Sequence, residues 1–416
     1  MIMRERILLI LMLLTTFTSF CQQDIELLLI ARNTGAKVLA NGDTIRVFGF
    51  AQSLAAQPGV PGPTIVANEG DSVHIDLWNV SQGAPHTIHL HGLDVNQQND
   101  GVPHLSFDVP HLEHGFYNFM APHAGTYLYH CHVVSTIHVQ AGMYGLIIIK
   151  PSDGSNTTWN GGFPYTEEHA YFLSEIDTTW HKDSVLLHDH DTTMAIHLIE
   201  IPKYDPQFFL INGFSDQQLI EENENFNSSV NQSDYVRLAN IGYYGSRVIF
   251  PPELNARIVS SDGRPLNDVE VTDTVYLYPG ERYGVLTEAN MEFQGQISFE
   301  YIDLNTMRIK NTQVVPVNVS GFVEINEITG NDFPFKIIPN PISQNAKIEF
   351  ELKDYRNVKI RIIDLNGRLV SDTPYRLFQS GENFVDIGKM VQAKGIYMVQ
   401  LIVEGAGSSI QKMIKQ

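Results

Sequence analysis

Eight side chains with nitrogen or sulfur donors lie in one stretch of the chain, and their spacing constrains the fold more than any other feature. They are His86, His89, His91, His130, Cys131, His132, His138 and Met143. Because side chains alternate between the two faces of a strand, His89 and His91 share one face while His86 lies on the other. The same alternation separates Cys131 from its two histidine neighbours. If the two segments are neighbouring strands, the donors gather on two opposite sides of the strand pair.

The two groups of donors differ in chemistry. His86, Cys131, His138 and Met143 offer two imidazoles, a thiolate and a thioether, which is the donor set of a blue-copper electron-transfer site with a weak axial methionine. The other four histidines offer nitrogen alone, a set that suits copper meeting oxygen or another small acceptor. A lone His-x-His pair is usually a pair of surface histidines, but clustered imidazoles and a free thiol have no packing reason to recur at these offsets. An electron that enters at Cys131 would have one residue to cross to reach the histidine group.

Further motifs surround the donors and sharpen this interpretation. They are Pro61-Gly62-Pro63-Thr64-Ile65, Glu69-Gly70-Asp71, Trp78-Asn79, Asp100-Gly101-Val102-Pro103 and Gly125-Thr126-Tyr127. With them, residues 24–152 resemble a copper-binding cupredoxin domain of the multicopper oxidase family. The resemblance implies type 1 copper roles for His86, Cys131, His138 and Met143, and type 2 and type 3 roles for His89, His91, His130 and His132. It also implies that Asp100 feeds protons to oxygen, although an ordinary Asp-Gly turn explains this residue equally well.

The chain departs from the family in its count of histidines. Residues 165–322 resemble a second cupredoxin-like domain without obvious copper ligands, through Asn212-Gly213, Val236-Arg237-Leu238-Ala239-Asn240, Asp262-Gly263 and Pro279-Gly280-Glu281-Arg282-Tyr283. A complete trinuclear cluster in this family uses eight histidines, and the first domain supplies four. All sixteen histidines lie at or before His197. The spacing of seven positions from Cys131 to His138 is also longer than in many members, so we expect a long loop over Val133 to Ile137.

The segment that connects the two domains contains the other His-x-His pair. His188 and His190 lie there, with His181 and His197 nearby. These histidines are either ligands donated to a neighbouring subunit of a homo-oligomer, as in two-domain relatives, or solvated polar residues in a connection rich in Asp and Thr. The second alternative is the simpler one, and the sequence leaves the first open.

The amino terminus has the pattern of an export signal. Met1 to Leu14 combines two arginines with an apolar run that is too short to span a membrane as a mature helix, so we predict a signal peptide over residues 1–22. Cleavage near Cys21 fits this pattern better than lipidation of that residue. Cys131 is then the only cysteine of the mature chain, which excludes an internal disulfide. Bound copper would hold this single thiol.

The carboxyl-terminal segment, residues 335–416, has a character of its own. Its motifs are Pro339-Asn340-Pro341, Asp364-Leu365-Asn366-Gly367-Arg368 and Gly395-Ile396-Tyr397. With them, it resembles the C-terminal sorting domain of the type IX secretion system. The resemblance implies that this machinery is a partner, and that the protein crosses the periplasm and outer membrane of a Bacteroidetes-type bacterium to be secreted or held at the cell surface.

Composition agrees with an all-β fold. Short apolar or alternating runs, such as Val73 to Leu77 and Gly145 to Ile149, are separated by Gly, Pro, Asn and Asp turns. We therefore expect two cupredoxin-like Greek-key β-sandwich or barrel domains followed by a small β-sandwich sorting domain. The 416 residues suffice for two or three domains, and the net charge of −20 argues against nucleic acid and anionic membranes as partners. No membrane span is expected in the mature chain.

Two functions follow as hypotheses. The first is a copper-dependent oxidoreductase that takes single electrons from a small-molecule or metal-ion reductant at Cys131 and passes them to the histidine group, where oxygen is reduced. The second is an extracellular blue-copper electron carrier or copper-binding protein without oxidase activity. A nitrite-reductase-like enzyme is a weaker third possibility, because no candidate for its remaining histidine ligand follows His197.

Overall fold

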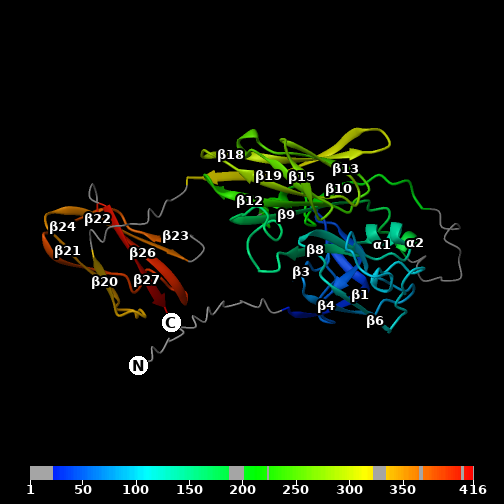
Figure 1. Cartoon of the computed structure of the whole chain (residues 1–416), viewed down its shortest axis with the longest axis horizontal. Coiled ribbons are helices and arrows are strands. Elements are labelled where there is room, and N and C mark those ends of the chain that lie inside the picture. The colour runs from blue at the N-terminus through cyan, green and yellow to red at the C-terminus, as the bar shows by residue number, and fades with distance from the viewer. Residues whose placement is uncertain are drawn as a thin grey trace, which may run out of the picture. The chain divides into compact units, whose positions relative to one another are not determined.

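The computed structural model describes six stretches of the chain, which are residues 22–186, 201–222, 224–321, 334–364, 369–403 and 407–415. The chain divides into two compact units, residues 1–322 and 323–416 (Figure 1). Most of the predicted signal peptide lies outside the described residues, as do His188, His190 and His197. Within the described part, no helix is long and apolar enough to cross a membrane.

The first unit begins with a β-sandwich that contains all eight candidate ligands. One of its sheets has the order β2 (Thr44–Ala51), β1 (Asp24–Val38), β4 (Ser72–Asn79) and β6 (His114–Met120). The other has the order β3 (Ile65–Asn68), β8 (Tyr144–Lys150), β7 (Gly125–His130) and β5 (His89–His91). Short helices η1 (Gln97–Asn99), α1 (Ser135–Ala141) and α2 (Asp183–Leu186) complete this part. Both sheets contribute side chains to one buried core.

Side-chain alternation explains how these strands are positioned. In β4 every second residue, including Val73 and Ile75, is buried, as expected for a strand with one face on a core. Strand β8 is buried along almost its whole length. Its Ile147 belongs to the core of the first sandwich, whereas Ile148 packs in a second cluster with Phe172 of the next sandwich. The sheet that holds the candidate histidine ligands is therefore covered on both faces.

A second sandwich completes the first unit and is drawn in green to yellow in Figure 1. One sheet has the order β10 (Phe208–Ile211), β9 (Glu167–Ile176), β12 (Ser233–Asn240), β17 (Arg282–Glu288), β14 (Arg257–Ser261) and β15 (Arg264–Val271). The other has the order β11 (Phe226–Ser229), β19 (Arg308–Ser320), β18 (Phe293–Asp303), β13 (Gly245–Ile249) and β16 (Thr274–Leu277). Helices α3 (Gln217–Glu221) and η4 (Pro252–Leu254) are its only described helices. The sheets share a core of buried aromatic and aliphatic side chains.

The second unit is a small all-β body with its own hydrophobic core. Its first sheet has the order β20 (Phe335–Ile338), β21 (Lys347–Leu352) and β25 (Gly381–Asp386). Its second has the order β23 (Leu369–Asp372), β22 (Arg356–Asp364), β26 (Gly395–Val403) and β27 (Gly407–Lys415), with β24 (Arg376–Phe378) also paired to β22.

The predicted all-β class is confirmed, because strands dominate every part that the structure describes. One local expectation is wrong. The long loop predicted over Val133 to Ile137 is partly helical, because α1 begins at Ser135 and contains His138. Val134, with φ of 44° and ψ of 45°, turns the chain from the end of β7 into this helix.

Candidate metal centre

Two antiparallel strands bring the donor-rich segments together. Strand β5 pairs with β7 in a register that places His89 opposite His130 and His91 opposite Leu128. Cys131 and His132 follow directly after the end of β7. The alternation of side chains therefore separates the donors into two groups on opposite sides of this pair, as the residue spacing requires.

The thiol group lies on the buried side. Cys131 Sγ is 3.2 Å from Nδ1 of His138 and 3.6 Å from Nδ1 of His86, and all three side chains are fully buried. Met143 is fully buried in the same core cluster as Cys131, and its backbone oxygen accepts a hydrogen bond of 3.0 Å from the Cys131 amide. Helix α1 supplies His138, and the turn that follows it supplies Met143. Two imidazole nitrogens thus converge on one buried sulfur.

Burial favours the neutral form of His86. Desolvation, followed by the proximity of His138, lowers the pKa of His86 well below its ordinary value of 6.5. A neutral imidazole is the form that binds a metal. Nε2 of His86 is buried without a hydrogen-bond partner, so Nδ1, which faces Cys131, is the nitrogen with a role at this site.

Four histidines gather on the other side of the strand pair. One ligand nitrogen from each of His89, His91 and His130 lies within 4.8 Å of the other two. Nδ1 of His91 is 3.4 Å from Nε2 of His130. His132 is a neighbour of this set, with its ring centroid 5.3 Å from that of His89, but it is not one of the three that converge. The structure therefore brings three of the four predicted nitrogen ligands into one group.

Hydrogen bonds and burial prepare these three histidines as ligands. Nδ1 of His130 lies 3.1 Å from the carbonyl oxygen of Cys131, and Nδ1 of His89 lies 2.7 Å from the carbonyl oxygen of Asp100. A carbonyl only accepts, so both Nδ1 atoms carry the proton and both Nε2 atoms are free to bind a metal. Burial lowers the pKa of His130 to about 3, and burial followed by the charge of Arg282 lowers that of His91 to about 4.

Asp100 stands beside the histidine group. Its carboxylate Oδ2 is 3.5 Å from Nδ1 of His89, in addition to the bond from that nitrogen to its backbone oxygen. The residue also ends helix η1 and precedes Gly101, whose φ is +80°. The Asp-Gly turn is therefore present, and the role of Asp100 in proton delivery stays a prediction.

The second sandwich contributes to the surroundings of the histidines, which sequence reasoning missed. A side chain at Gly280, whose φ is +84°, would stand 3.1 Å from Cε1 of His91. Arg282 donates to the backbone oxygens of Gly280 at 2.6 Å and Thr126 at 3.3 Å, and pairs with Asp262 at 2.9 Å. Gly280 and Arg282 belong to the motif at residues 279–283. In the sequence this motif indicates only a cupredoxin-like fold and does not predict a contact with the histidines.

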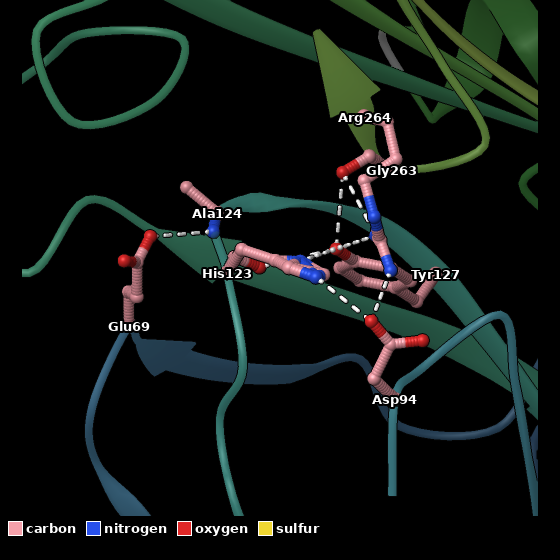
Figure 2. Close-up of polar contacts among 7 residues, drawn as sticks. All are labelled: Glu69, Asp94, His123, Ala124, Tyr127, Gly263 and Arg264. Atoms are coloured by element: carbon pink, nitrogen blue, oxygen red, sulfur yellow. Dashed lines mark hydrogen bonds and ion pairs between the residues drawn. The ribbon is translucent and has the colours of Figure 1, made fainter.

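A polar network anchors the start of β7 to the second sandwich (Figure 2). Tyr127 donates from its hydroxyl to the backbone oxygen of Gly263 at 3.1 Å and accepts from Arg264 Nη1 at 3.0 Å. Arg264 Nη2 also bonds to Asp94 at 2.8 Å, and Nε2 of His123 lies 3.2 Å from the same carboxylate oxygen. Since β7 leads directly to His130, this network helps to fix the strand that positions both donor groups.

An open cleft of roughly 430 Å³ reaches the histidine group. Its lining includes His91 and His130 on one side and Gly242, Tyr243 and Gly280 of the second sandwich on the other. A small molecule therefore has access to this group, whereas the thiol group is enclosed. His181, a candidate ligand in the connecting segment, lies elsewhere, because it is buried with Nδ1 2.7 Å from the backbone oxygen of Arg46.

Comparison with known families agrees with this geometry. Two family models, both described as multicopper oxidase, match residues 46–154 and 171–303, which together are more than half of the chain. The chain belongs to the multicopper oxidase family. A third model, described as a secretion system C-terminal sorting domain, matches residues 336–416. The predicted family and the predicted sorting tail are both confirmed.

Individual relatives of this multicopper oxidase family member include enzymes and resistance proteins. The chain is 27% identical over 283 residues to copper resistance protein A of Pseudomonas syringae pv. tomato, covering 58% of this chain and 43% of that protein. It is 28% identical over 360 residues to an iron transport multicopper oxidase of Candida albicans, covering 83% and 51%. The chain thus spans about half the length of these curated relatives. Among solved structures, the blue copper oxidase from Nitrosomonas europaea superposes with a TM-score of 0.57 at 25% identity, covering 71% of this chain and 86% of that one.

Copper, the cofactor of this family, fits the donors that the chain presents. The thiol group has the soft sulfur and imidazole donors of a type 1 copper site, and its sulfur-to-nitrogen distances of 3.2 and 3.6 Å match donors that share one ion. The second group presents only imidazole nitrogens, which also suit copper.

Proposed function

We propose that this protein is an exported copper oxidoreductase that takes single electrons from a small reductant at the Cys131 group and uses them at the histidine group to reduce oxygen. The observation that carries the proposal is the junction between the groups: Cys131 and His130 are adjacent in the chain and belong to different donor groups. Copper supplies one-electron redox chemistry at the first group and an acceptor-binding cation at the second.

The residues of this chain provide the connection between the two groups. The peptide bond between His130 and Cys131 is a covalent path from sulfur to imidazole. A hydrogen bond of 3.1 Å from Nδ1 of His130 to the carbonyl oxygen of Cys131 runs parallel to it. The enclosed position of the thiol excludes oxygen from the first group, while the cleft admits it to the second.

Asp100 is the residue that we assign to proton supply. Its carboxylate is 3.5 Å from His89 and its side chain is partly exposed to solvent. A carboxyl group in this position can take protons from water and release them beside the histidine group, where oxygen reduction consumes them. Its backbone bond to His89 holds that ligand in orientation at the same time.

A second cavity, of roughly 390 Å³, supports a place for the reductant. Thr136 of α1 lines it together with Trp180, Tyr204, Tyr243 and Tyr244. Helix α1 also supplies His138, so a molecule bound there lies near the thiol group, and Thr136 and Tyr243 line both this cavity and the cleft at the histidine group. The mixture of aromatic and charged lining residues fits a small organic reductant better than a bare metal ion.

Substitution of the thiol tests the proposal. The Cys131→Ser protein is expected to lose an intense blue band and all oxidation of two probe reductants, hydroquinone and ferrous ion. The His74→Gln protein, altered in β4 outside the donor groups, should keep both properties. Oxidation that survives Cys131→Ser would show that electrons do not enter at this residue.

The alternative of an electron carrier or copper-binding protein rests on the histidine count, because the first sandwich supplies four histidines where the family's cluster uses eight. Oxygen uptake separates the two functions: an oxidase consumes oxygen when the reductant is added, and a carrier is reduced once and stops. The sorting domain at residues 336–416 supports export in either case. We place the protein outside the cell or at its surface, delivered by type IX secretion machinery of a Bacteroidetes-type bacterium.

A further inference from the structure

The histidine group does not provide the trinuclear cluster that its family implies. Among the described residues of the second sandwich and the segment before it, the histidines are His169 and His181. His169 packs its ring 4.4 Å from that of Phe226, and His181 bonds to the backbone of Arg46. Neither belongs to the set formed by His89, His91 and His130. The described chain therefore offers half of the expected ligands.

We propose that His89, His91 and His130 hold a single copper ion within one chain, so that this protein has a mononuclear three-histidine site in place of half a trinuclear cluster. The inference depends on the proposed function only for the choice of copper as the metal. It predicts two copper ions per chain, one at each donor group, without a contribution from a neighbouring subunit.

The distances fit one shared ion. Two nitrogens that each lie about 2.0–2.1 Å from a metal at a tetrahedral angle are about 3.4 Å apart. Nδ1 of His91 and Nε2 of His130 are 3.4 Å apart, and the nitrogen of His89 completes a set in which every separation is within 4.8 Å.

Hydrogen bonds orient two of the three ligands. The carbonyl oxygens of Asp100 and Cys131 hold the protons on Nδ1 of His89 and His130, which directs their Nε2 atoms to the metal. His132 is not part of the converging set: its backbone amide donates to Thr87 Oγ1 at 2.9 Å, and its ring centroid lies 5.3 Å from that of His89.

The second sandwich borders the histidine group on one side. Gly280 faces the ring of His91, and the guanidinium of Arg282 lies where a side chain at Gly92 would stand. A glycine backbone and a cation therefore border the group on this side. The positive charge of Arg282 opposes the accumulation of several copper ions at one place. The cleft of roughly 430 Å³ still leaves the metal one side that is open to a small ligand.

Copper counting on single chains tests the inference. The full-length mature protein is loaded with Cu(II), dialysed against a weak chelator and measured for copper per chain, oligomeric state and EPR spectrum. We expect two copper ions per monomeric chain, with one blue signal and one ordinary type 2 signal split by three nitrogens. Four copper ions per chain, one copper ion per chain, or a second ion found only in oligomers would overturn the inference.

Variants assign the second ion to its ligands. The His91→Ala protein should hold one copper ion and keep the blue band, which reports that the protein is folded. The matched His132→Ala protein should hold two, whereas loss of the second ion in this variant would contradict the three-histidine set. The Cys131→Ser protein should keep the type 2 signal, so the site is tested even if electron transfer from Cys131 fails.

Discussion

Nδ1 of His91 lies 3.4 Å from Nε2 of His130, and Gly280 of the other sandwich stands directly against the ring of His91. The position of one candidate ligand, His91, is therefore set by a strand pairing inside one sandwich and by a close backbone approach from the next.

Substitution of Gly280 by Ala tests this dependence. The new methyl group would lie 3.1 Å from Cε1 of His91, and the residue has a φ of +84°. We expect loss of the second copper ion with the blue band retained, and a fall of about 1–2 kcal/mol in the free energy of unfolding. Gly42→Ala is the matched control, because its φ is +86° and nothing lies within 4 Å of the added carbon. Equal copper content in the two variants would show that contact with His91 does not position the ligand.

If the protein reduces oxygen with two copper ions per chain, as proposed, the product follows from the number of electrons that one chain stores. Two copper ions hold two electrons, which suffice to reduce oxygen to hydrogen peroxide with two protons, whereas reduction to water takes four. We expect about one hydrogen peroxide for each oxygen consumed with hydroquinone as reductant. An oxygen electrode checks this, because added catalase returns about half of the consumed oxygen. No return of oxygen would indicate a cluster that delivers four electrons.

The buried ion pair of Arg237 contributes to stability beside the start of β7. Its Nε donates to Glu168 at 2.6 Å and its Nη1 to Thr126 Oγ1 at 3.0 Å. Replacement by Met leaves the Glu168 carboxylate without its main partner, so the free energy of unfolding should fall by about 3 kcal/mol in urea titrations. The double variant Arg237→Met/Glu168→Gln should recover part of this loss.

A solvent-exposed pair is the control for Arg237. Lys310→Met, which breaks the 3.1 Å contact with Asp205, should change stability by less than about 1 kcal/mol. If Arg237→Met and Lys310→Met lower the free energy of unfolding by the same amount, burial does not strengthen the Arg237 pair.

Side-chain alternation made the two donor groups predictable from the sequence. His89 and His91 share a face because they are two positions apart in a strand, and Cys131 opposes its neighbours for the same reason. This rule is local, so it needs no knowledge of the rest of the fold. It also separated His86 from the other two histidines of its segment, and the structure brings His86 to Cys131.

Contacts between distant segments were not predictable in the same way. Arg282 reaches Thr126 across 156 positions, and no periodicity in the sequence signals such a contact. The helix that holds His138 has seven residues, which is too short to show an apolar repeat, and its start depends on the left-handed backbone at Val134. The arrangement of three converging histidines with His132 at the edge likewise depends on ring orientations that spacing alone does not determine.

Glu175 gives the first unit a dependence of stability on pH. Its side chain is fully buried, and this burial raises its pKa to about 7, although the Tyr243 amide and the Tyr204 hydroxyl donate to it and lower the pKa in part. An acid with a raised pKa in the folded state stabilises that state fully below its unfolded pKa of 4.5, and the contribution is lost as the pH rises through 7.

Replacement of Glu175 by Gln tests this effect, because Gln keeps an oxygen that accepts both hydrogen bonds and cannot ionise. From pH 5 to pH 8 the wild type should lose about 2–3 kcal/mol of its free energy of unfolding relative to the Glu175→Gln variant. The size follows because each pKa unit of difference between the folded and unfolded states corresponds to about 1.4 kcal/mol. Urea titrations at several pH values measure this difference. A difference that stays constant over this range would mean that Glu175 ionises as readily in the folded protein as in the unfolded chain.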